Sequence, residues 1–127
     1  MIKLMYITNN YKICKFLEHI GVDRIFLDLE FEGKKLRQGH LNTFISDHKI
    51  SDIKNIKNVI KNIDLLVRVN PLSKNSSKEI NEVIKLGASH IMMPMIKNHL
   101  EVRELVNIVS KRCKIIPLIE TTQGIEN

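Results

Sequence analysis

Apolar residues along the chain gather in five short runs that are rich in β-branched side chains. Each run is almost continuously apolar and shows little alternation with polar residues, which is typical of strands covered on both faces of a parallel sheet. The pattern therefore predicts five buried strands, at Leu4–Ile7, Ile25–Phe31, Leu65–Asn70, Ile91–Met95 and Ile115–Glu120.

Between these runs the apolar residues recur with the period of an α-helix. Asn10 is the predicted N-cap of the first helix and Gly21 lies just past its end. Ser76 and Glu79 stand at capping-box spacing at the start of the third. Four helices are predicted: Tyr11–Ile20, an amphipathic one over Lys49–Lys61, one from Ser76 to a stop at Gly87, and one that opens at Asn98 and runs through Val109.

The alternation of strands and helices predicts an α/β fold with right-handed crossovers and a parallel sheet. Both a β/α barrel and an open, doubly wound sheet fit the spacing. The phosphate-binding glycine patterns that often accompany a doubly wound sheet, G-x-G-x-x-G and G-x-x-x-x-G-K-[ST], do not occur in the sequence.

The chain carries 20 lysines and arginines against 14 aspartates and glutamates, a net charge of +6. The lysines are scattered through the sequence, Trp is absent and few residues are aromatic, so the charge indicates a solvated surface and not a nucleic-acid interface. No run is long and apolar enough for a membrane span, and Cys14 and Cys113 lack metal-binding spacing. We expect a cytoplasmic protein with buried or free thiols and no membrane or nucleic-acid partner.

Charged and polar residues stand at the carboxyl ends of three predicted strands. Asp28 and Glu30 follow one another at period two, Arg68 and Asn70 do the same, and Glu120 ends the last strand. An ionised group inside such a run costs several kcal/mol, roughly, unless it is paired or binds a metal. Because ligands bind at this edge of β/α folds, these residues are candidate site residues, with a structural buried ion pair as the alternative.

Four segments carry a resemblance to a known family: Leu27-Asp-Leu-Glu30, Val67-Arg-Val-Asn70, Gly87-Ala-Ser-His-Ile-Met-Met-Pro-Met95 and Pro117-Leu-Ile-Glu-Thr121. In this order and spacing they resemble the HpcH/HpaI aldolase and citrate lyase β-subunit family of the phosphoenolpyruvate/pyruvate-binding superfamily. The resemblance implies a (β/α)8 TIM barrel, a Mg²⁺ or Mn²⁺ cofactor, and cleavage of a carbon–carbon bond in a 2-oxoacid or acyl-CoA substrate through a metal-stabilised enolate.

The resemblance also implies roles for individual residues. Glu120 matches the metal-ligand glutamate, and Arg68 matches the arginine that binds a substrate oxygen and stabilises the enolate. Asp28 and Glu30 match the acidic pair that lines the site near the metal. Asn70 is a candidate substrate contact beside Arg68.

One departure from the family concerns the proton-transfer histidine of the aldolase branch, whose position is taken here by Phe31. The long polar segment from Gly33 to Ile50 is a candidate lid or substrate-binding segment. It holds Arg37, a candidate substrate contact, and His40 and His48, either of which is a candidate for the missing base.

A second departure is the extent of the barrel, because only five of about eight strands are present. We expect residues 1–127 to form the N-terminal part of one barrel, truncated after the fifth strand, with two open edges. Two functions follow: an incomplete metal-dependent lyase or aldolase that forms a homo-oligomer when full length, or a non-catalytic remnant that associates with itself.

Overall fold

The computed structural model describes residues 2–31 and 46–127 and contains one parallel sheet of five strands. All five predicted strands are present, which confirms the interpretation of the apolar runs. Four of them end two or three residues earlier than predicted, so Glu30, Asn70 and Glu120 lie in the loops that follow. The strands are β1 Met5–Ile7, β2 Arg24–Asp28, β3 Asp64–Arg68, β4 His90–Met93 and β5 Lys114–Pro117.

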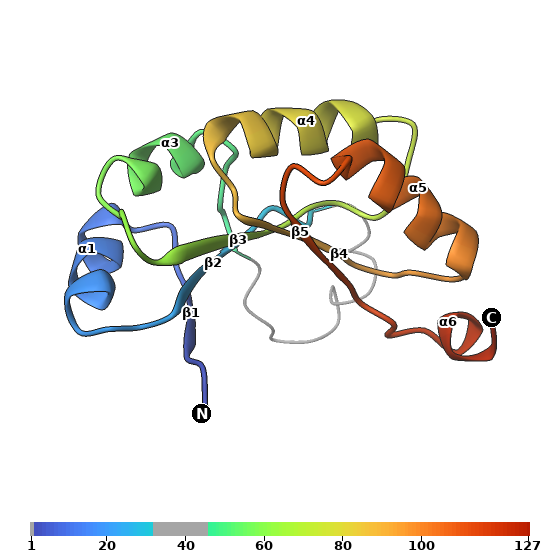
Figure 1. The fold of residues 1–127 in the computed structure, drawn as a ribbon, viewed down its shortest axis with the longest axis horizontal. Helices are drawn as coiled ribbons and strands as arrows, with labels where there is room; N and C mark the ends of the chain where they lie inside the picture. The colour runs from blue at the N-terminus through green and yellow to red at the C-terminus, as the bar shows by residue number, and fades with distance from the viewer. Residues whose placement is uncertain (1, 32–45) are drawn as a thin grey trace.

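Helices connect the strands and pack in a single layer on one face of the sheet (Figure 1). The first, third and fourth predicted helices are confirmed almost to the residue. The second is shorter than predicted at both ends: it begins at Asp52, whose carboxylate accepts the N–H of Lys49 at 2.8 Å, and it ends at Lys57. The helices are α1 Tyr11–His19, α3 Asp52–Lys57, α4 Ser76–Leu86, α5 His99–Val109 and a short α6 Thr122–Glu126.

The helix caps agree with the sequence at two of three places. The side chain of Asn10 accepts the N–H groups of Lys12 and Ile13, and Asn98 caps α5 in the same way. The predicted capping box at α4 is wrong. Asn75 is the N-cap and makes no side-chain cap bond, while Glu79 accepts hydrogen bonds from Asn70 instead.

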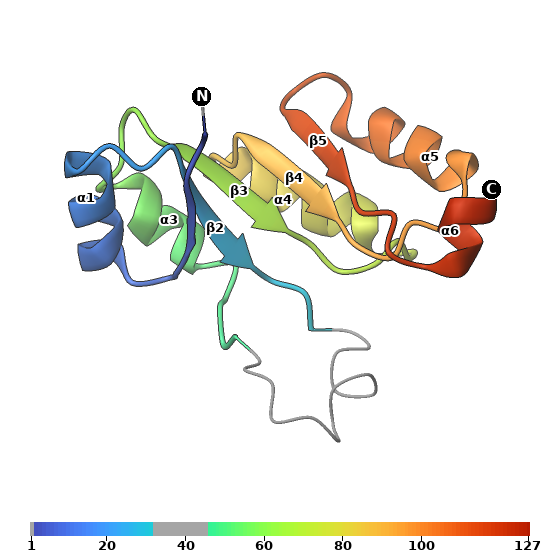
Figure 2. The same cartoon turned by 90° about the horizontal axis from the view of Figure 1, so that it is seen from below.

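The strand order distinguishes between the two folds that the sequence left open. The order is β1-β2-β3-β4-β5, every neighbouring pair is parallel, and the described helices α1, α3, α4 and α5 all lie on the same side (Figures 1 and 2). A doubly wound sheet reverses its strand order and carries helices on both faces. The chain therefore folds as five consecutive β/α units of a barrel, as the resemblance implied.

Alternate side chains of each strand face opposite sides of the sheet. Ile25 and Leu27 of β2 and Val67 of β3 belong to the buried core beneath the helices. Phe26, Leu66 and the two charged residues of each of these strands lie on the other face, called here the inner face. No described helix covers the inner face, so it is the side on which a barrel interior would form.

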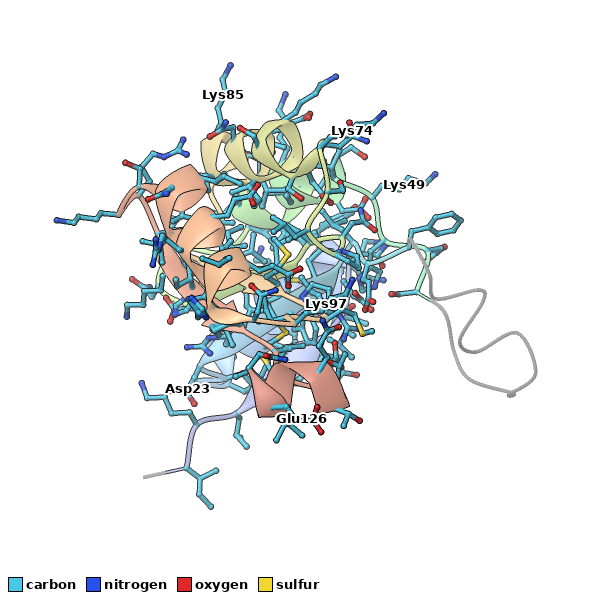
Figure 3. All side chains as sticks on the ribbon, turned by 90° about the vertical axis from the view of Figure 1, so that its right-hand side faces the viewer. Asp23, Lys49, Lys74, Lys85, Lys97 and Glu126 are labelled. Carbon is cyan, nitrogen blue, oxygen red and sulfur yellow. The ribbon has the colours of Figure 1, made fainter. Side chains whose placement is uncertain are left out.

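The positive charge is spread over the surface, as predicted. Lys49, Lys74 and Lys85 point outward from different parts of the chain (Figure 3). Among the described residues, no helix is long and apolar enough to cross a bilayer. Both cysteines are free thiols, and burial raises the pKa of Cys14 to about 11.

Candidate active site

The ends of β2 and β3 bring the central charged residues together. Asp28 is the last residue of β2, Arg68 is the last residue of β3, and the parallel register places them directly opposite each other on the inner face. Glu30 follows two residues later on the same side as Asp28. The sequence prediction that these three residues meet at the carboxyl edge of the sheet is therefore confirmed.

Arg68 forms ion pairs with the carboxylates of both Asp28 and Glu30. Its Nε and one terminal nitrogen (Nη2) donate to the two oxygens of Asp28 at 2.9 and 2.8 Å, and Nε also lies 3.3 Å from Glu30 Oε2. The side chains of Asp28 and Glu30 are 3% and 2% exposed, against 20% for Arg68. The paired arrangement fixes the plane of the guanidinium, and its other terminal nitrogen (Nη1) donates no hydrogen bond to a described residue.

Among the described residues, the charges of three carboxylates act on Arg68. The hydrogen bonds to Asp28 raise the pKa of Arg68, burial opposes them, and the charges of Asp28, Glu30 and Glu120 raise the pKa further. The guanidinium of Arg68 lies over the ring of Phe26, with 5.4 Å between Arg68 Cζ and the centre of the ring. Arg68 is consequently a permanently charged, oriented donor, and the buried ion pair of the structural alternative is also present.

His48 lies beside this cluster, in a cavity of ≈ 300 Å³ that also involves Asp28, Glu30 and Phe31. Its Nδ1 accepts the backbone N–H of Asp28 at 3.0 Å, and Ser46 Oγ donates to Asp28 Oδ2 at 3.1 Å. Because Nδ1 is an acceptor, the neutral ring carries its proton on Nε2. In this arrangement the main chain of Asp28 occupies Nδ1 of His48.

Asn70 braces the loops that follow β2 and β3. Its Oδ1 accepts the N–H of Phe31 at 2.9 Å, and its Nδ2 donates to Glu79 of α4 at 2.9 Å. These bonds tie the end of β2 to the first turn of α4. The structure thus places Asn70 at the predicted edge and gives its side chain a structural task there.

Glu120 lies beyond the end of β5, and its side chain is exposed. One of its oxygens accepts the backbone N–H of Met95 at 3.0 Å. Its charge contributes to the raised pKa of Arg68, so both groups act on the same region of the carboxyl edge.

The described residues form no metal site. Arg37 and His40 lie outside the described residues. Within residues 2–31 and 46–127 no three His, Cys, Asp or Glu side chains gather into a metal site. Asp28 and Glu30 pair with Arg68, and the described residues do not by themselves hold Mg²⁺ or Mn²⁺.

Several contributors to the site were not predicted from the sequence: Phe26, Ser46, Glu79 and the backbone of Met95. Phe26 could have been found, because it alternates with Asp28 on the same face of β2. Ser46 and the Met95 N–H carry no local sequence signal, since each acts on a residue that is distant along the chain.

Five consecutive β/α units with charged residues at the carboxyl edge place the chain in the class of TIM-barrel-like β/α proteins. The family model described as HpcH/HpaI aldolase/citrate lyase matches residues 3–127, and the chain belongs to this family. This confirms the resemblance carried by the four sequence segments.

Solved structures with the same fold include macrophomate synthase, with a TM-score of 0.67, 17% identity, and coverage of 98% of this chain and 50% of that one. The HpcH/HpaI aldolase from Desulfitobacterium hafniense DCB-2 has a TM-score of 0.66 and 16% identity, covering 98% of this chain and 55% of that one. The chain thus spans about half the length of these structures. None of the curated proteins compared with the chain matches it.

Proposed function

We propose that this chain carries the substrate-binding half of a carbon–carbon lyase or aldolase site that acts on a 2-oxoacid or acyl-CoA-type substrate. The observation that supports this proposal is the Arg68 guanidinium, oriented by Asp28 and Glu30 at the edge where barrel enzymes bind their ligands. Nη1 of Arg68 is the donor that would contact a substrate carboxylate or enolate oxygen.

In this proposal Arg68 supplies fixed positive charge to the oxygen on which negative charge develops as the carbon–carbon bond breaks. Asp28 and Glu30 act through Arg68 by holding the guanidinium in place. His48 is the candidate residue for proton transfer, and Arg37 and Asn70 are the candidate substrate contacts. A divalent ion, Mg²⁺ or Mn²⁺, would take Glu120 as one ligand and its remaining ligands from outside the described residues.

An assay of pyruvate or acyl-thioester release from 2-oxoacid and acyl-CoA substrates, in Mg²⁺ or Mn²⁺, tests the activity. We expect Arg68→Lys to lower kcat/KM about 100-fold, because lysine keeps the charge and loses the paired geometry. Absence of both cleavage and binding of every substrate by the wild-type protein would overturn the proposal.

Metal binding is tested separately by titration of Mn²⁺ followed by electron paramagnetic resonance. Glu120→Ala should weaken Mn²⁺ binding at least tenfold. Glu126→Ala is the matched control, because Glu126 is an exposed carboxylate on the neighbouring α6. Equal weakening by both substitutions, or by neither, would remove Glu120 from the ligand set.

A second candidate function is self-association without catalysis, which the exposed edge of the sheet favours. Side chains of Met5, Tyr6 and Ile7 on edge strand β1 are 49%, 48% and 50% exposed. Exposed apolar edge strands promote pairing with another chain. Size-exclusion chromatography with light scattering distinguishes the candidates: a folded monomer that binds Mn²⁺ favours the lyase half-site, and a stable oligomer that binds none favours self-association.

A further inference from the structure

The loop that follows β4 contains a residue in an unusual backbone conformation. Met95 has φ = 59°, in the left-handed region that residues other than glycine, asparagine and aspartate seldom adopt. Such a conformation persists only where surrounding contacts hold it in place, and it often marks a functional site. The contacts of Met95 therefore indicate what the conformation achieves.

The left-handed turn aims the backbone N–H of Met95 at Glu120. The N–H donates to Glu120 Oε1 at 3.0 Å, across 25 residues of sequence. Met95 itself is only half-buried, so its side chain is not an anchor of the core. The directed bond from the main chain is the feature that distinguishes this position.

The segments on either side of this contact are locked together. The N–H of Leu118 donates to Met93 O at 2.9 Å, and the N–H of Ile96 donates to Leu118 O at 3.1 Å. Thr121 Oγ1 donates to Ile96 O at 3.4 Å. This ladder fixes the loop after β4 against the loop after β5, so the Met95 N–H and Glu120 are held in register.

Gly124 of α6 packs directly against the loop that follows β4. A Cβ atom at this position would overlap the carbonyl oxygen of Ile96. Gly124 N also donates to Thr121 Oγ1 at 3.0 Å, which caps α6. The close approach of α6 to the loop after β4 therefore depends on glycine, and it brings Glu120 and Met95 to the same side.

We propose that Met95 is a positioning residue whose left-handed backbone, and not its side chain, orients the Glu120 carboxylate at the carboxyl edge of the sheet. One oxygen of Glu120 is held by the Met95 N–H, which restricts the orientation of the whole carboxylate. The effect on a bound cation rests on the proposed function, whereas the effect on Glu120 does not.

The test compares two substitutions at position 95. Asparagine tolerates the left-handed conformation and valine strongly disfavours it, although both remove the methionine side chain. Hydrogen–deuterium exchange of the residue-95 amide, followed by NMR on the full chain, reports the bond to Glu120. The amides of Leu118 and Ile96 are internal controls, because they bond to backbone carbonyls nearby.

We expect Met95→Asn to keep the protection of this amide and Met95→Val to lose it about tenfold, the loss expected for one hydrogen bond to an ionised acceptor. Glu120→Ala should cause the same loss with the native methionine in place, which covers the case in which the valine variant does not fold. Unchanged protection in Glu120→Ala, or equal loss in the asparagine and valine variants, would overturn the inference.

Mn²⁺ titration of the same variants separates this inference from the proposed function. If the wild type binds Mn²⁺, Met95→Val should bind it about tenfold more weakly and Met95→Asn normally, a rescue that loss of side-chain packing does not predict. If the wild type binds no Mn²⁺ while the exchange pattern holds, the metal part of the proposed function fails and the positioning role stands.

Discussion

The inner face of β2 and β3 carries two arginine–aspartate pairs of opposite order. At the amino edge Arg24 of β2 faces Asp64 of β3, and at the carboxyl edge Asp28 of β2 faces Arg68 of β3. The amino-edge pair makes one contact of 3.7 Å, and its side chains are 27% and 45% exposed. The carboxyl-edge pair makes two bonds below 3 Å with an almost fully buried aspartate.

The surroundings of each pair explain this difference. At the carboxyl edge Glu30 adds a second carboxylate and Phe26 supplies an aromatic face. At the amino edge the neighbour of Arg24 is instead an imidazole, and Arg24 Nη2 lies 3.3 Å from His90 Nε2. Arg24 Nε is buried and has no hydrogen-bond partner among the described residues. The same two residue types thus form a tightly hydrogen-bonded, buried ion pair at the carboxyl edge and a weak, partly exposed ion pair at the amino edge.

The largest expected effect comes from removing the organised arginine. Arg68→Met removes the cation that pairs with the buried carboxylates of Asp28 and Glu30, so the free energy of unfolding should fall by roughly 3–5 kcal/mol in urea denaturation at pH 7. Arg103→Met, on the exposed surface of α5, should change it by less than about 0.5 kcal/mol. Similar values for the two variants would contradict the contrast between the edges.

A smaller effect on stability is expected from Glu18, whose carboxylate binds the backbone just before the amino end of β3. Its Oε1 accepts the backbone N–H groups of Lys61 and Asn62 at 2.5 and 2.6 Å, just before β3 begins. These bonds lower the pKa of Glu18 below its usual 4.5. The stability they contribute is therefore complete above pH 4.5 and is lost as the pH falls through the lowered pKa.

Glu18→Gln should consequently lower the free energy of unfolding at pH 7 by no more than about 1 kcal/mol, because the group is open to solvent. The difference from wild type should vanish toward pH 3. Glu82→Gln, an exposed glutamate of α4, is the control and should follow the wild type throughout. A difference at pH 7 that persists at pH 3 would assign the effect to packing.

The smallest effect is expected from Arg24→Met, which should change stability at pH 7 by about 0–1 kcal/mol. Its informative consequence is in acid. Burial and the charge of Arg24 lower the pKa of His90, Asp64 opposes them, and Lys114 lowers it further. The unfolded state therefore binds more protons than the folded state below pH 6.5, and stability falls as the pH is lowered.

Removing Arg24 should make this fall shallower between pH 7 and pH 5, as measured by thermal unfolding at each pH. His90→Gln provides the limit in which the contribution of this histidine is absent. An Arg24→Met profile that is as steep as that of the wild type would show that burial alone governs His90, and would remove Arg24 from the electrostatics of the amino edge.

Much of the candidate site could be predicted because parallel strands end at one edge. Asp28, Glu30, Arg68 and Glu120 were placed there correctly, since each follows a buried apolar run. An ion pair among them was one of the two alternatives, but which carboxylate bonds to Arg68 could not be predicted. The Asp28–Arg68 pair joins residues 40 apart in sequence, and Asn70, predicted as a substrate contact, braces Phe31 and Glu79.

The sequence by itself determined the features that depend on near neighbours: the five strands, the helix caps at Asn10 and Asn98, and the glycine stop at Gly87. Such features are satisfied within a few residues, so their signals are local. Only the tertiary structure shows which strands lie side by side, and this order confirms the barrel that the family resemblance implied. The tertiary structure also shows that Glu79 accepts a hydrogen bond from Asn70 and does not cap α4, and that Met95 N–H donates to Glu120. Neither bond could be predicted, because each depends on the packing of segments that are not adjacent in sequence.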